Sequence, residues 1–126
     1  MKVLFDHQIF LLQKYGGISR YFVSLCNALE SHGINPYIFA PVSVNHYLNT
    51  SSSKNSHTIS LPLLPSYSIK PLIGLFDIIS QFLSFDLVHR TFYYCNHNYS
   101  IFGGNKGLRV LTVYDLIDEL FFSDSQ

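Results

Sequence analysis

The sequence is poor in charge. Only 13% of its 126 residues are charged, and eight basic residues balance eight acidic ones. A chain without net positive charge has no electrostatic footprint for nucleic acid, so we exclude that class of partner. Hydrophobic residues make up 48% of the chain, which is too much apolar surface for a disordered polar tract. We therefore expect one folded domain over residues 1–126.

Cysteine is also scarce. Cys26 and Cys95 are the two cysteines, and they form no Cys-x-x-Cys pair. Two cysteines are too few for a disulfide scaffold, so reduced thiols are expected. Cys95 and His97 lie near His89, but no fourth ligand follows at the spacing of a zinc site. We predict no metal site.

Long apolar runs are missing as well. The first run ends at Asp6, and the most apolar window, residues 69–85, is interrupted by two charged residues, a proline and a glutamine. Neither apolar run fits a signal peptide or a membrane span, so we predict a cytoplasmic protein. The helix expected within this window carries almost no charge. Burial against a sheet is the simpler interpretation, and docking on a membrane surface is the alternative, although attraction to anionic lipid is not supported.

Aromatic residues, in contrast, are abundant: the chain has eleven Phe and nine Tyr but no Trp. A neutral, apolar and aromatic domain is expected to be poorly soluble unless a partner covers part of its surface. We therefore expect either self-association or a partner polypeptide.

The order of the apolar segments predicts an α/β fold. A short strand over residues 3–5 precedes a long loop over 7–17, a helix that begins near Ile18 and stops at His32–Gly33, and a strand over 36–40. This β–loop–α–β order is typical of a Rossmann-like, doubly wound parallel sheet.

The second half of the chain extends the same pattern. We predict a surface loop over residues 43–57 and a helix that has Pro71 in its first turn and runs to about Ser84. Strands are predicted over 58–61, 86–89 and 108–113, and a helix over 116–122.

Ligands of open parallel sheets bind beyond the carboxyl ends of the strands. Residues 6–17, 89–91 and 114–115 should meet there. Glycines at the start of a helix let a phosphate approach free backbone amides, so the Gly16–Gly17 pair is a candidate ligand site; a tight turn is the alternative. His89 could orient a hydroxyl or relay a proton, or be a satisfied structural residue.

Three blocks of the sequence resemble glycosyltransferase family 4 enzymes. The first consists of LFDHQIF (residues 4–10) and QKYGGISRYF (residues 13–22), and it is similar to the amino-terminal segment of that family. DLVH (residues 86–89) and LTVYDLIDELF (residues 111–121) are similar to two further blocks, in the same order and with similar spacing. The resemblance spans nearly the whole chain.

The resemblance implies a GT-B architecture, in which two Rossmann-like domains face each other across a cleft. It implies retaining transfer of a sugar from a nucleotide diphosphate donor, which is a substrate, to a glycan or lipid-linked acceptor, with no required metal or cofactor. The chain would then be the acceptor-side domain, truncated or one half of a split enzyme and inactive alone, with a separate donor-binding domain as its partner.

The resemblance also implies roles for individual residues. Gly16 and Gly17 would lie against the donor phosphates or the reacting sugar, and His89 and Arg90 would line the same cleft. The family usually has His where this chain has Tyr114, and tyrosine can donate a hydrogen bond but cannot act as an imidazole. The remaining cleft or acceptor residues would be Asp6, Ser19, Arg20 and Asp115.

Two other functions remain open at this stage. One is a non-catalytic remnant or binding module that recognises a sugar, a nucleotide or a partner protein. The other is an unrelated nucleotide-binding domain, which the long first loop and the missing Gly-x-Gly-x-x-Gly pattern disfavour.

Overall fold

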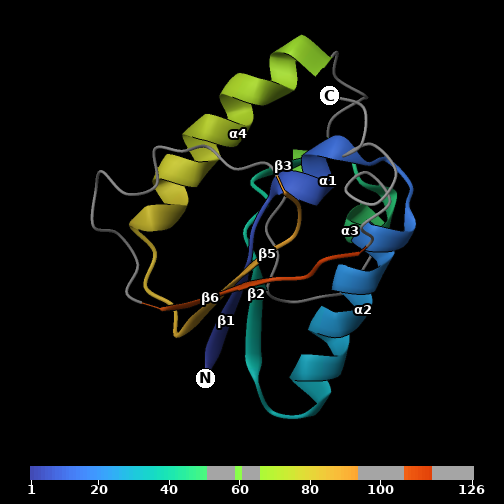
Figure 1. Ribbon diagram of the computed structural model, residues 1–126. Coiled ribbons are helices and arrows are strands. Elements are labelled where there is room, and N and C mark those ends of the chain that lie inside the picture. Colours follow the sequence, from blue (N-terminus) through green and yellow to red (C-terminus); the bar gives the residue numbers. More distant parts are fainter. Residues whose placement is uncertain (51–58, 61–65, 94–106, 115–126) are drawn as a thin grey trace, which may run out of the picture.

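A computed structural model of the chain describes residues 1–50, 59–60, 66–93 and 107–114. A four-stranded sheet forms its centre, with the strand order β2-β1-β5-β6 and every neighbouring pair parallel (Figure 1). Its strands are β1 (Lys2–Phe5), β2 (Asn35–Ile38), β5 (Leu87–Arg90) and β6 (Leu108–Leu111). A second parallel pair consists of β3 (Val42–Ser43) and β4 (Ile59–Ser60). The described helices are α1 (Gln8–Leu12), α2 (Gly17–Ser31), α3 (His46–Thr50) and α4 (Ser66–Gln81).

Helices cover both faces of the sheet. Alternate residues of β1 point to opposite sides: Val3 and Phe5 pack in the core cluster that contains Phe22 and Cys26 of α2, whereas Leu4 packs in the one that contains α4. Figure 1 shows α4 on one side of the sheet and α2 on the other. The parallel, Rossmann-like α/β fold predicted from the sequence is confirmed at this level.

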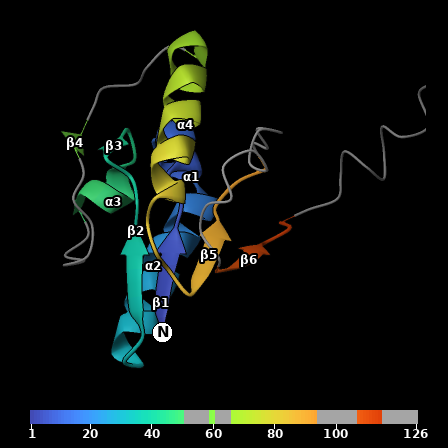
Figure 2. The same ribbon diagram turned by 90° about the vertical axis from the view of Figure 1, so that its left-hand side faces the viewer.

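The strand order changes direction at β1. The chain runs from β1 through α2 to β2 on one side, and later returns through α4 to β5 on the other side (Figure 2). The carboxyl ends of β1 and β5 therefore lie beside the switch point, which is where doubly wound sheets bind ligands.

Residues 7–17 are not one long loop. Five of them form α1, and Ile9, Phe10 and Leu11 are buried where α1 contacts α2, α4 and β3. The apolar run stabilises this short helix because it fills the space between the larger elements.

The prediction of a surface loop over residues 43–57 is wrong for the first part of this segment. Val44 and Leu48 are buried, and the Oδ1 of Asn45 accepts the backbone N–H of Leu48 at 3.1 Å, at the start of α3. The polar residues that suggested a loop act here as turn and capping groups. Residues 51–57 and the helix predicted over 116–122 lie outside the described residues.

Pro71 lies inside α4 rather than in its first turn, because the helix begins five residues earlier, at Ser66. The outer face of α4 carries the exposed side chains of Leu75, Ile78 and Ile79, and the exposed Phe82 directly follows the helix. No helix of the described segments is long and apolar enough to cross a lipid bilayer.

Gly107 controls how β6 joins the sheet. A Cβ at this position would lie 2.4 Å from the carbonyl oxygen of Phe85 and 2.9 Å from that of Asp86. The neighbouring Leu108 N–H donates to the Asp86 carbonyl oxygen at 2.9 Å. Only glycine fits this close approach of two backbones.

We expect Gly107→Ala to destabilise the domain by about 1–3 kcal/mol, because the clash involves rigid backbone atoms. Urea denaturation would measure the loss, and faster hydrogen exchange at the Leu108 amide would locate it. Gly17→Ala is the matched control, since a Cβ there meets no atom within 4 Å. Equal stability of the two variants would contradict this view of β6.

Candidate functional site

The candidate site residues fall into two groups at the carboxyl ends of β1 and β5, one on each face of the sheet. The first, which we call the α2-face cluster, contains His89, Tyr114, Tyr21, Phe22 and Tyr93. The second is a pocket under α4.

Ring contacts hold the α2-face cluster together. The Phe22 ring centroid lies 5.1 Å from that of His89 and 6.2 Å from that of Tyr114. Tyr21, near the start of α2, also contacts Tyr114, with ring centroids 6.3 Å apart. The structure therefore brings the beginning of α2, His89 and Tyr114 to the same end of the sheet.

His89 is a neutral, partnered residue. It packs against Phe5 and Phe22, and burial lowers the pKa of its imidazole. Its Nε2 lies 2.8 Å from the Oγ1 of Thr112, just beyond β6. This contact fixes the ring orientation.

Tyr114 differs from His89, because its buried hydroxyl has no hydrogen-bond partner among the described residues. Burial raises the pKa of this phenol well above its ordinary value, so the group stays protonated. The Tyr114 backbone N–H donates to the Tyr93 hydroxyl at 2.6 Å, which holds the chain beyond β6 against the segment after β5. Tyr114 thus offers a hydroxyl that can still donate.

The two glycines at the start of α2 have different surroundings. Gly16 is the N-cap, and a Cβ there would lie 2.2 Å from the Oε1 of Gln13. Gly17 faces open space. Ser19 is buried and its hydroxyl donates to the Gly16 carbonyl oxygen at 3.1 Å, whereas Arg20 is exposed. Asp115 lies outside the described residues.

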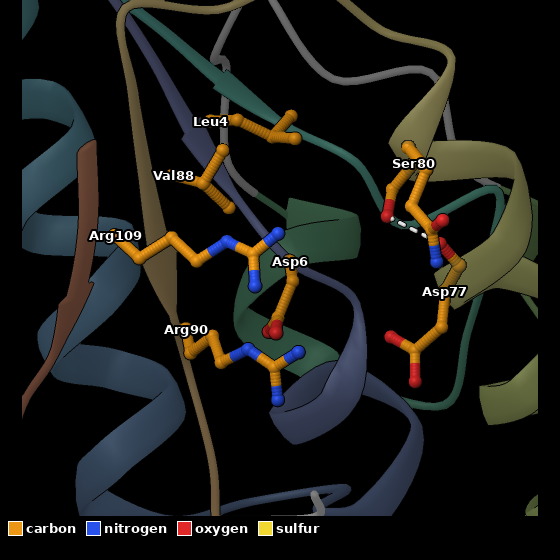
Figure 3. A pocket seen from close by; sticks show the side chains of 8 residues that line it. Leu4, Asp6, Asp77, Ser80, Val88, Arg90 and Arg109 are labelled. Carbon is orange, nitrogen blue, oxygen red and sulfur yellow. Dashed lines mark hydrogen bonds between the residues drawn. The ribbon is translucent and has the colours of Figure 1, made fainter. Parts of the chain in front are cut away.

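The pocket under α4 contains two further predicted residues. Asp6 and Arg90 line it together with Asp77 of α4 and Arg109 of β6 (Figure 3). The structure therefore does not bring His89 together with Arg90, although the two residues are predicted to line the same cleft. They are consecutive residues of β5, so their side chains point to opposite faces of the sheet.

Asp6 is a buried junction between β1 and β5. Its Oδ1 accepts the Thr91 backbone N–H at 2.9 Å, the Thr91 hydroxyl at 2.5 Å and the Gln8 N–H at 3.4 Å. Burial raises the pKa of the carboxyl, although the hydrogen bonds from Thr91 oppose this change. This network gives Asp6 a structural role.

Asp77 and His7 form a second buried polar pair. The His7 Nε2 lies 3.8 Å from the Asp77 Oδ1 and 3.2 Å from the Ile73 carbonyl oxygen, to which it donates. Burial lowers the pKa of His7 to about 4 and raises that of Asp77 to about 7. His7 is therefore neutral at neutral pH, while Asp77 titrates there.

Sequence reasoning missed His7, Asp77 and Arg109. A signal existed for Asp77, which is the single acidic residue of α4 and lies within an apolar stretch of that helix. A lone acid among apolar residues indicates either a solvent-facing position or a buried polar site, and here it is buried.

The described residues contain no group of three His, Cys, Asp or Glu side chains that could hold a metal ion. One face of the sheet offers the protonated phenol of Tyr114. The other face offers carboxyl groups with raised pKa values, which lie near two guanidinium groups. No protein-family model matches the chain, and no solved structure matches it significantly.

Proposed function

We propose that the chain is the amino-terminal, acceptor-side domain of a retaining GT-B glycosyltransferase of the family 4 type. In this proposal it acts in the cytoplasm and holds a glycan or lipid-linked acceptor. A second, donor-binding domain supplies the nucleotide diphosphate sugar. The reaction needs no metal or cofactor from this chain.

The observation that carries the proposal is the α2-face cluster. The three blocks that resemble the family are far apart in the sequence, yet the start of α2, His89 and Tyr114 meet beside the switch point of the sheet. A cleft built from these blocks requires this arrangement.

The cluster also suggests a division of roles. Gly17 leaves open space at the first turn of α2, where backbone amides and the helix dipole favour a phosphate. The Tyr114 hydroxyl stays protonated and can donate to an oxygen that gains charge in the transition state. His89, held by Thr112, orients the neighbouring groups.

A non-catalytic sugar- or partner-binding module is the second candidate. It is favoured by Tyr114 at the position where the family usually has histidine, and by Asp6 and Arg90 on the face away from His89.

The two candidates differ in an enzymatic test. The purified chain alone, incubated with labelled nucleotide sugars and a panel of glycan acceptors, should give no glycoside, because half a cleft cannot orient two substrates. Fusion to the donor-binding domain of a family 4 enzyme should give a product. In that fusion Tyr114→Phe should lower kcat by about a hundredfold through loss of one donor to the transition state.

Tyr15→Phe is the matched control, because Tyr15 is exposed and packs against His46 and Tyr47 outside the cluster. A folded fusion that makes no product with any pair of substrates would favour the binding module. Transfer by the chain alone that survives repurification and is lost in Gly17→Trp would contradict the need for a second domain.

A further inference from the structure

The two edges of the four-stranded sheet differ in how they are protected. β2 forms one edge, and most of this strand is buried or half-buried. The backbone N–H groups of Asn35 and Phe39 donate to the carbonyl oxygens of Met1 and Phe5, on the β1 side of the strand. Backbone groups of successive residues alternate between the two edges of a strand, so Pro36 stands at an outward position, where it removes a donor. This edge is therefore protected against pairing with another strand.

β6 forms the other edge among the described strands (Figure 2). All of its residues are exposed, and it contains neither proline nor lysine. Leu108 is 74% exposed, and Val113, which follows the strand, is 57% exposed. The exposed apolar side chains lie on both faces of the sheet, with Val110 on the face of His89 and Leu111 on the opposite one. An exposed apolar edge of this kind is a template for a further strand.

The backbone of β6 determines which residues face this open edge. The Leu108 N–H donates to the Asp86 carbonyl oxygen at 2.9 Å, on the β5 side of the strand. By the same alternation, the N–H and carbonyl groups of Arg109 and Leu111 point outward. A partner strand must therefore form its hydrogen bonds with these two residues.

A second copy of β6, running antiparallel to the first, meets this requirement. A two-fold axis through Val110 places Arg109 of each copy opposite Leu111 of the other. Outward backbone groups then meet outward backbone groups, as in a hydrogen-bonded pair. The two Val110 side chains form a close pair at the centre, and cross-strand pairs of β-branched residues stabilise a sheet.

Charge favours the same register. Arg109 is the single charged residue of β6, and its side chain lines the pocket under α4 (Figure 3). An axis through Arg109 would place two guanidinium groups directly opposite each other, which destabilises a cross-strand pair. An axis through Leu111 would pair β6 with residues 112–114, beyond the end of the strand. The chain has no net charge, so long-range repulsion does not keep two copies apart.

We propose that two copies of the chain associate through antiparallel pairing of their β6 strands, with a two-fold axis at Val110, and so form one continuous sheet. This interface goes beyond the proposed transfer reaction, because it uses an edge of the sheet and not the α2-face cluster. Antiparallel pairing turns the carboxyl ends of the two sets of strands in opposite directions. The two α2-face clusters therefore lie at opposite ends of the joined sheet, where each can face its own second domain.

The first test uses the unmodified chain. Sedimentation over a concentration series should show a reversible equilibrium between monomer and dimer. Amide hydrogen exchange at both ends of this series locates the interface. The outward amides of Arg109 and Leu111 should exchange about tenfold more slowly, or slower still, in the dimer, whereas the Leu108 and Val110 amides, which face β5 in both states, should change little.

Charged variants at Val110 test the position of the two-fold axis. Val110→Lys and Val110→Glu each place like charges opposite each other, so each should weaken dimerisation about tenfold or more. An equimolar mixture of the two variants should dimerise again, because lysine then faces glutamate. Ile79→Lys adds the same charge to the exposed outer face of α4 and is the matched control, which should dimerise like the unmodified chain.

Three results would overturn the proposal. The first is a monomer, or larger aggregates alone, at every concentration up to about 1 mM. The second is protection on dimerisation at other amides in place of Arg109 and Leu111, or loss of the dimer in Ile79→Lys, which would place the interface elsewhere. The third is a mixture of the two Val110 variants that stays monomeric although circular dichroism shows both to be folded.

The exchange measurement needs no variant, so it decides the question even if a Val110 variant does not fold. None of these results bears on transfer by the fusion protein, so this proposal and the proposed function fail separately.

Discussion

Asp6→Ala should destabilise the domain by about 3 kcal/mol or more, a large part of the stability of a chain of this size. The substitution leaves the Thr91 backbone N–H, the Thr91 hydroxyl and the Gln8 N–H without their acceptor in a buried environment. It also weakens the connection between the carboxyl ends of β1 and β5, because Asp6 follows β1 and its partner Thr91 follows β5. Urea denaturation monitored by circular dichroism would measure the loss.

Asp6→Asn is the matched variant. Its amide oxygen can still accept from Thr91, so the expected loss is about 1 kcal/mol. Thr91→Val removes the other side of the same bond, together with the acceptor of the Ile9 N–H. If Asp6→Ala and Asp6→Asn destabilise equally, the carboxyl does not act through these hydrogen bonds.

The second large effect is a pair of opposite pH dependences at Asp77 and His7. The pKa of Asp77 rises on folding from 3.8 to about 7, so between these values the folded state keeps a proton that the unfolded state has lost. Its contribution to stability therefore falls as pH rises. The pKa of His7 falls on folding from 6.5 to about 4, so the unfolded state takes up a proton that the folded state refuses, and stability falls as pH drops.

The two contributions oppose each other in the wild-type chain between about pH 4.5 and 6. Asp77→Asn leaves the His7 effect, so its free energy of unfolding should rise with pH, relative to wild type, by up to about 1.4 kcal/mol per pH unit. His7→Gln keeps a donor near the Nε2 position and leaves the Asp77 effect, so its relative slope should have the opposite sign.

Urea denaturation at half-unit pH steps gives these slopes. The comparison uses slopes rather than absolute stabilities, so a general loss of packing in either variant does not affect it. Parallel pH profiles for the three proteins would show that the two groups are not buried as described.

The strands of the four-stranded sheet and α2 could be predicted because their signals are local, whereas β3 was not predicted. The run Val3–Phe5 and the helical spacing from Ile18 to Leu29 each specify an element within a few residues. The short helix α1 could not be predicted in this way, because five residues are too few for a periodic pattern. Its stability comes from contacts with α2, α4 and β3, which the sequence does not show.

The α2-face cluster follows from strand ends, which the sequence does show. Predicting the pocket under α4 requires further information. The alternation of side chains along a strand is sufficient to place His89 and Arg90 on opposite faces of the sheet. The position of Arg109 beside Val88 and Arg90 depends on the register that pairs Val88 with Arg109. This register is set by packing over the whole sheet.

The strand order has a further consequence for synthesis of the chain on the ribosome. Lys2 of β1 pairs with Asn35, whereas Val3 pairs with Leu87 on the other edge of the same strand. The β1–α2–β2 unit can therefore assemble long before β5 has been made. At the usual rate of translation, the second edge of β1 stays unpaired for about three to ten seconds. Chaperones that bind extended segments have that interval in which to protect this edge from other nascent chains.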